Sequence, residues 1–150
     1  MDRRLLPVVV TALAVASLTP VAGAKPGPPA VWGSTLVAPR LVPGRVGTYV
    51  YTATSGDALQ LTVTLEKLPL QLRLLRIGST PYRLVAGRAT WTLQFPPGEG
   101  LTNRIAIRVR TAATARVGST ICVTLRQVAE SGGGVPEVVP KRVCRLVQRP

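Results

Sequence analysis

Two cysteines placed symmetrically about a run of three glycines constrain how the last third of this 150-residue chain can fold. Cys122 and Cys144 lie at equal distances from Gly133, the middle glycine of the run. The flanking segments, "ICVTLRQVA" and "VVPKRVCRLV", are rich in β-branched residues and bounded by Gly and Pro, as strands usually are. A three- or five-residue turn centred on Gly133 would join them as a hairpin, because glycine accepts a positive φ at no steric cost.

The register of this hairpin predicts a disulfide between Cys122 and Cys144. Directly opposed residues of an antiparallel pair bring their Cβ atoms within the reach of a disulfide. Two unpaired buried thiols are the alternative, which the export signal described next opposes, since disulfides persist in oxidising compartments. Pro136 and Pro140 cannot donate to a ladder, so we expect the second strand of the hairpin at a sheet edge.

The first 24 residues have the organisation of a secretory signal peptide. Arg3 and Arg4 precede an apolar stretch at residues 5–18, and "AGA" supplies the small residues before a cleavage site after Ala24. A membrane anchor is the alternative, but the stretch is shorter than the roughly 20 residues that span the hydrocarbon core. We expect an exported protein, whether periplasmic, cell-surface or extracellular, with no transmembrane span in the mature chain and a Pro/Gly-rich leader at residues 25–33.

Alternation of apolar and polar residues predicts the fold class. Three segments, "VGTYVYTATS", "ALQLTVTLEKLP" and "NRIAIRVR", alternate with a period of two, which is typical of half-buried strands. Gly- and Pro-rich turn signals separate them. We therefore expect a single all-β domain at residues 34–150, an antiparallel β-sandwich. The residues expected to face its core are Tyr49, Tyr51, Ala53, Leu59, Leu61, Val63, Leu65, Ile105, Ile107 and Val109.

Several short motifs follow one another in a recognisable order. They are Pro43-Gly44, the strand at residues 49–54, Leu68-Pro69, Trp91 and Pro97-Gly98. This order resembles that of the bacterial conserved-repeat domain known as domain of unknown function eleven, and the resemblance covers residues 43–130. It implies an immunoglobulin-like module of a secreted or cell-surface bacterial protein, of a kind often found in tandem.

The sequence offers little that could perform catalysis. It contains no histidine, the commonest general base and metal ligand, and a disulfide would remove both thiolates. Glu66 and Glu99 could meet across a sandwich, but a glycosidase needs two carboxylates that flank a bond, and turn capping and solvation also explain these two. We expect no enzyme activity, no metal and no cofactor. The other carboxylates after residue 24 are Asp57, Glu130 and Glu137.

Positive charge is the strongest functional signal. The whole chain has 19 basic and 6 acidic residues, and loss of residues 1–24 would leave a net charge of +12. Arg104, Arg108 and Arg110 have even spacing and should share one face of a strand. Arg142 and Arg145 of the hairpin complete the candidate site for a polyanion or a partner. A solvated basic exterior is the alternative, since charged side chains must face water somewhere.

These observations predict a non-enzymatic structural or interaction module of the bacterial cell envelope or surface. Its expected partners are an acidic envelope polymer or a larger surface assembly. The alternative is an extracellular nucleic-acid-binding protein that uses the stripe formed by Arg104, Arg108 and Arg110. The scarcity of aromatic residues, 4% of the chain, makes nucleic acid the less favoured partner, because single-strand binders stack bases on exposed aromatic rings.

Overall fold

The computed structural model describes residues 31–55, 58–95, 101–131 and 137–150, which form nine β-strands. The signal peptide expected at residues 1–24, most of the leader at residues 25–33 and the glycine turn at Gly133 lie outside the described residues. No helix occurs in the described part, as the sequence predicts. The strands are β1 Val31–Val37, β2 Val46–Ser55, β3 Ala58–Leu65, β4 Leu72–Ile77, β5 Arg83–Val85, β6 Arg88–Gln94, β7 Thr102–Thr111, β8 Thr120–Ser131 and β9 Glu137–Leu146.

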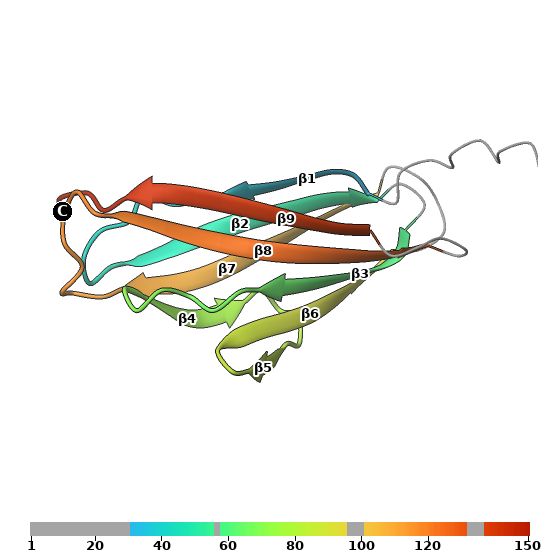
Figure 1. Cartoon of the computed structure of the whole chain (residues 1–150), viewed down its shortest axis with the longest axis horizontal. Coiled ribbons are helices and arrows are strands. Elements are labelled where there is room, and N and C mark those ends of the chain that lie inside the picture. Colours follow the sequence, from blue (N-terminus) through green and yellow to red (C-terminus); the bar gives the residue numbers. More distant parts are fainter. Residues whose placement is uncertain (1–30, 56–57, 96–100, 132–136) are drawn as a thin grey trace, which may run out of the picture.

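The strands form two sheets that lie face to face along the long axis of the molecule (Figure 1). One sheet has four strands in the order β1-β2-β7-β4, and the other has five in the order β5-β6-β3-β8-β9. Every pairing of strands within these sheets is antiparallel. Since the chain changes sheet after β2, β3, β4, β6 and β7, neighbours in each sheet are mostly distant in sequence.

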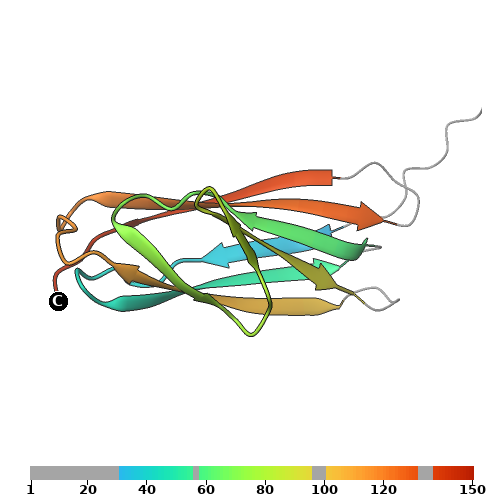
Figure 2. The ribbon, with the colours of Figure 1, turned by 90° about the horizontal axis from the view of Figure 1, so that it is seen from below.

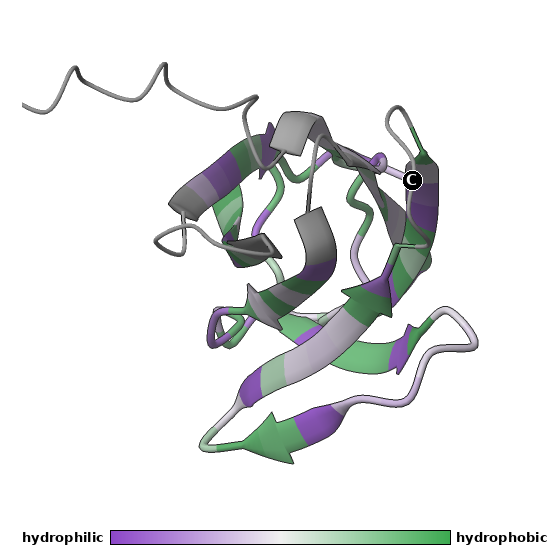
Figure 3. Cartoon of the chain, turned by 90° about the vertical axis from the view of Figure 1, so that its right-hand side faces the viewer, coloured by the Kyte–Doolittle hydropathy of each residue, from purple (hydrophilic) through white to green (hydrophobic). Residues whose placement is uncertain are grey.

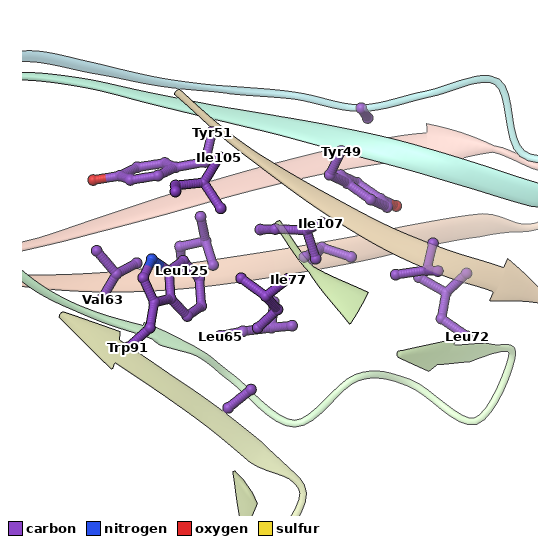
Figure 4. Packing of buried hydrophobic residues seen from close by; sticks show 14 of the residues in the cluster. Tyr49, Tyr51, Val63, Leu65, Leu72, Ile77, Trp91, Ile105, Ile107 and Leu125 are labelled. Atoms are coloured by element: carbon purple, nitrogen blue, oxygen red, sulfur yellow. The ribbon is translucent and has the colours of Figure 1, made fainter. Parts of the chain in front are cut away.

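Alternation along the strands places the core where the sequence predicts it, apart from Leu59, whose side chain lies outside the described part (Figure 4). Tyr49 and Tyr51 of β2 are about 1% exposed or less, whereas the residues between and beside them are half-buried. The ring of Tyr51 meets the ring of Trp91 from the opposite sheet edge to face, with centroids 6.5 Å apart. Such an arrangement is favourable for aromatic pairs and joins the two layers. Other core residues from both sheets are Ala53, Leu61, Val63, Leu65, Ile105, Ile107, Val109 and Leu125.

The C-terminal hairpin has the predicted register. Cys122 lies opposite Cys144, and the same register extends from Thr120↔Leu146 to Ala129↔Glu137. The two cysteines form a disulfide, with their Cα atoms 4.0 Å apart. Strand β9 ends the order of its sheet, so the edge position expected from its prolines is also confirmed.

The two long sides of the sandwich differ. On one side, Leu41 and Val147 form a parallel bridge beyond β1 and β9, and both side chains are buried. The amide of Gln148 donates to the carbonyl of Leu41 at 2.8 Å, which ties the C-terminal segment to the chain between β1 and β2. The other side carries the edge strands β4 and β5 (Figure 2), and the end-on view shows the β5–β6 hairpin at the margin of the body (Figure 3). One side is therefore closed by the chain itself, and the other presents two strand edges.

Two buried tyrosines in adjacent inward positions have different polar surroundings. The hydroxyl of Tyr51 donates to Oε1 of buried Gln127, whose Nε2 donates to Oγ of Ser34 at 3.1 Å. The hydroxyl of Tyr49 is buried without a hydrogen-bond partner among the described residues. A buried hydroxyl with a partner stabilises the fold, whereas one without a partner carries an uncompensated desolvation cost.

We expect Tyr51→Phe to lower the free energy of unfolding by about 1–3 kcal/mol, because Gln127 loses a buried donor. Tyr49→Phe is the matched control, since it removes an equivalent hydroxyl that makes no such bond, and should leave the free energy unchanged or higher. Urea denaturation of both variants measures the difference. Equal losses in the two variants would contradict the assignment of the polar contacts.

The disulfide should contribute about 3 kcal/mol to the free energy of unfolding on the chain-entropy model, because it closes a loop between residues 22 apart in sequence. Replacing Cys122 and Cys144 together with serine should lower stability by this amount. Thiol titration of the unfolded, unreduced protein should find no free cysteine. Two titratable thiols would show that the bond does not form in the exported protein.

Candidate functional site

Five arginines gather on the outer face of the four-stranded sheet. We call Arg73, Arg76, Arg104, Arg108 and Arg110 the arginine ladder. Strand β7 contributes three of them, because its inward positions are apolar and its outward positions alternate with these. Strand β4 contributes the other two, and its register with β7 sets Arg73 opposite Arg110 and Arg76 opposite Arg108. All five side chains are exposed.

Among the described residues, the other neighbour of β7 leaves the arginine ladder uncovered. Strand β2 lies on the far side of β7 from β4 and places Thr48 opposite Arg108 and Thr52 opposite Arg104. These side chains are short and uncharged. The ladder therefore stands above a sheet face that neither covers nor neutralises it.

The charges of the arginine ladder have no acidic partner among the described side chains. Glu66 is the one acidic side chain that the structure describes, and it lies on the other sheet. Its carboxylate forms ion pairs with Nε of Arg88 at 2.9 Å and with Nε of Arg126 at 3.3 Å. Like charges directly opposite one another on neighbouring strands are destabilising. The ladder thus holds a repulsion that a bound anion would relieve.

The structure does not bring Arg142 and Arg145 to the arginine ladder. Arg142 lies opposite Thr124 on the outer face of the five-stranded sheet, at the β9 edge. Arg145 lies opposite buried Ile121 and so starts from the inward face of the same strand. It lines a small cavity of about 180 Å³, next to Arg40 and the C-terminal segment. The five arginines proposed from the sequence are therefore distributed over three places.

Arg73 and Arg76 are the members of the ladder that the sequence analysis did not include. They belong to the segment "QLRLLRI", whose partner strand is distant in sequence. The even spacing of the β7 arginines is a local signal. Nothing local shows that β4 pairs with β7, so the opposition of arginine to arginine became visible only with the sheet order.

The residues considered for catalysis do not form a site in the described part of the chain. Glu66 is engaged in its two ion pairs, and Glu99 lies outside the described residues. Within the described ranges there is no group of three or more His, Cys, Asp or Glu side chains that could hold a metal ion. The same residues contain no helix with the length and hydropathy needed to cross a membrane.

Solved structures of low sequence identity share this fold. The major pilin subunit BcpA of Bacillus cereus matches with a TM-score of 0.59 at 13% identity, over 77% of this chain and 40% of the pilin chain. A cohesin module from a family 33 glycoside hydrolase of Clostridium perfringens matches with a TM-score of 0.58 at 13% identity, over 81% of this chain and 100% of the module. The N-terminal domain of a Streptococcus gordonii adhesin gives 0.58 at 12%, over 76% of this chain and 32% of that chain.

These likenesses establish the fold class. It is an immunoglobulin-like antiparallel β-sandwich with a disulfide-linked C-terminal hairpin, as the sequence predicts. The chain spans less than half the length of the pilin and adhesin chains. No protein-family model and no curated protein matches the sequence.

The surroundings of the two buried tyrosines change their acidity. Burial raises the pKa of Tyr49 to about 12, and the positive charge of Arg145 acts in the opposite direction. Burial also raises the pKa of Tyr51 above its ordinary value. A tyrosine in the unfolded chain ionises at about pH 10. Below that pH both tyrosines are neutral in the folded and the unfolded chain, so their ionisation costs no stability. As pH rises toward the folded pKa, the unfolded chain ionises first and the free energy of unfolding falls.

We expect the free energy of unfolding to fall between pH 10 and about 12, because over this window the unfolded chain releases a proton that folded Tyr49 retains. Tyr49→Phe should make this fall less steep, because phenylalanine has no proton to release. Urea denaturation in steps of pH, with wild type and variant in parallel, measures the two slopes. Identical slopes would show that Tyr49 ionises equally in both states.

Proposed function

We propose that this chain is an exported, non-enzymatic interaction module of the bacterial cell envelope or surface, which contacts an acidic polymer through the arginine ladder. The observation that carries the proposal is the register that sets arginine opposite arginine on β4 and β7, with no described acidic partner. Such an arrangement disfavours the isolated sheet and favours an anion placed over it.

The spacing of the ladder suits a linear polymer rather than a small anion. Outward residues two apart on one strand lie about 7 Å apart, and residues on neighbouring strands lie about 5 Å apart. Charges that repeat at such intervals along a polymer could meet successive guanidinium groups. Each guanidinium can also bind an oxyanion with paired hydrogen bonds.

The predicted export signal and the solved structures of similar fold support the same function. The signal peptide predicted at residues 1–24 would export the chain, and the resemblance to the conserved-repeat domain implies a secreted or cell-surface module. Pilin, adhesin and cohesin modules have the same fold, and an interaction role on such a scaffold is in keeping with them. Fold alone does not assign a function, so the proposal depends on the surface.

Nucleic acid is the competing polyanion. Proteins that bind single strands combine basic grooves with exposed aromatic side chains, on which the bases stack. Tyr49, Tyr51 and Trp91 are all in the core, so they provide no stacking surface beside the ladder. The absence of these rings from the outer face favours a polymer recognised by charge.

Replacing Arg104, Arg108 and Arg110 together with glutamine should weaken binding to a polyuronate such as alginate by tenfold or more. It should also lower the slope of log affinity against log salt by about 2–3, because roughly one counterion is released for each arginine–anion contact. Fluorescence anisotropy with labelled polymer across a salt series measures both quantities.

The matched control replaces three exposed arginines outside the ladder, Arg83, Arg142 and Arg149, and so removes the same charge. It should retain most of the affinity. Equal losses in the two triple variants would show that net charge alone binds the polymer and would contradict the ladder. A parallel series with single-stranded DNA of equal charge separates the two polymers, and tighter binding of DNA through the same arginines would favour the nucleic-acid function.

A further inference from the structure

An apolar cleft opens on the side of the sandwich that carries the edge strands β4 and β5. It has a volume of about 450 Å³ and lies between β4 and β5, the edge strands of the two sheets. Its buried wall is formed by Leu65 and Leu72, and Leu84 of β5 borders it with 61% of its surface exposed. Ligand sites in proteins are mostly clefts of this size lined by apolar side chains, so this cleft is a candidate site of interaction.

Cations border this cleft. Lys67 and Arg73 line it together with its leucines, and no acidic side chain of the described residues does so. Arg73 belongs to β4 and therefore joins the cleft to the outer face of the four-stranded sheet. A ligand in the cleft would thus contact aliphatic side chains within it and positive charge at its margin.

No strand of the described residues pairs with the outer edge of β4. The strand ends the order β1-β2-β7-β4. Next to its two ends, the carbonyl of Gln71 accepts from Ala112 and the amide of Gly78 donates to Ala106, so these residues direct their backbone groups toward the β7 side. Because direction alternates along a strand, Leu74 and Ile77 direct their backbone groups away from β7, toward the open edge.

We propose that the outer edge of β4 receives an extended segment of a partner protein, in which aliphatic and acidic side chains alternate. The segment would add a fifth strand to the four-stranded sheet, a common way of binding a peptide to an exposed edge. Successive side chains of a strand point to opposite faces of the sheet. One set would therefore enter the cleft, and the other would lie on the outer face.

Each set meets matching chemistry. The inward set would pack against Leu72, Leu74 and Leu84, which calls for aliphatic side chains. The outward set would lie beside Arg73 and Arg76, whose neighbours on the other side are arginines of β7. Acidic side chains in this position would give each of these two arginines an opposite charge and relieve the repulsion across β4 and β7.

Other occupants fit less well. A second copy of this chain, pairing β4 with β4, would bring arginine against arginine on the outer face. An acyl chain could fill the cleft, but it would leave the backbone groups of Leu74 and Ile77 unused. A partner strand uses the cleft, the edge and the two arginines together.

The probe is a synthetic peptide of four Val-Glu repeats, blocked at both ends and labelled for fluorescence anisotropy. Two control peptides are a block peptide of four valines followed by four glutamates and a peptide of four Val-Lys repeats. The alternating acidic peptide should bind at least tenfold more tightly than either control. Equal affinity for the block peptide would overturn the proposal, because composition rather than alternation would then decide binding.

Amide hydrogen exchange of the full exported chain locates the peptide. Exchange at Leu74 and Ile77 should slow when the alternating acidic peptide is added. Slowing confined to β1, β5 or β9 would overturn the assignment to β4.

A pair of variants tests the cleft without disturbing the core. Leu84→Asp places a negative charge at the margin of the cleft and should weaken peptide binding about tenfold. Val37→Asp is the control, since Val37 is exposed to a similar extent, 55%, on an edge strand at the closed side. Equal effects of the two variants would contradict the site.

The peptide test and the polymer test can be told apart, although Arg73 and Arg76 belong to both proposed surfaces, because the polymer variants change other arginines. Arg104, Arg108 and Arg110 do not line the cleft. Failure of the polyuronate to bind would leave the peptide result standing, and failure of the peptide would leave the polymer result standing.

Discussion

Burial of every second residue in β2, β3, β6 and β7 determines where all the other side chains of these strands point. The sandwich is stable only if Tyr51, Val63, Trp91 and Ile107 face one another across the two sheets. Once they do, the intervening residues have to face outward, whatever their charge. The arginines of β7 are exposed for this reason, and a shift of register by one residue would bury them. The same alternation along β7 therefore places its apolar side chains in the core and its arginines in the candidate site.

Much of this could be predicted from local sequence, and the remainder depends on pairing between distant strands. The symmetry about Gly133 gave the hairpin register and the disulfide, because a hairpin is a local structure. The even spacing of the β7 arginines gave their common face. Arg142 and Arg145 differ by three positions and so belong to opposite faces of β9, which the alternation rule already implied and the sequence-based grouping overlooked. The pairing of β4 with β7 cannot be predicted from local sequence, since more than twenty residues and the strands β5 and β6 lie between them.

The two sides of the sandwich have different relations to the rest of the chain. At the closed side, the Leu41–Val147 bridge joins the segments beyond β1 and β9, and the disulfide holds β9 to β8. At the open side, β4 and β5 lie on either side of a cleft and are not joined by backbone hydrogen bonds between described residues. An edge strand with unpaired backbone groups invites association with another chain. Positive charge on β4 disfavours pairing with a second copy of the same edge, and in the proposed strand addition Arg73 and Arg76 would also favour an acidic partner.

The direction of the strands has a mechanical consequence. The described chain begins with β1 at one end of the long axis, and the C-terminus lies at the opposite end (Figure 1). Hydrogen bonds between antiparallel strands are perpendicular to the strands. Tension applied between Val31 and Val147 would therefore act along the strands and load the β1–β2 ladder in shear, so that many hydrogen bonds resist together instead of opening one after another. The position of the two ends makes this sandwich suited to transmit a pulling force along its length.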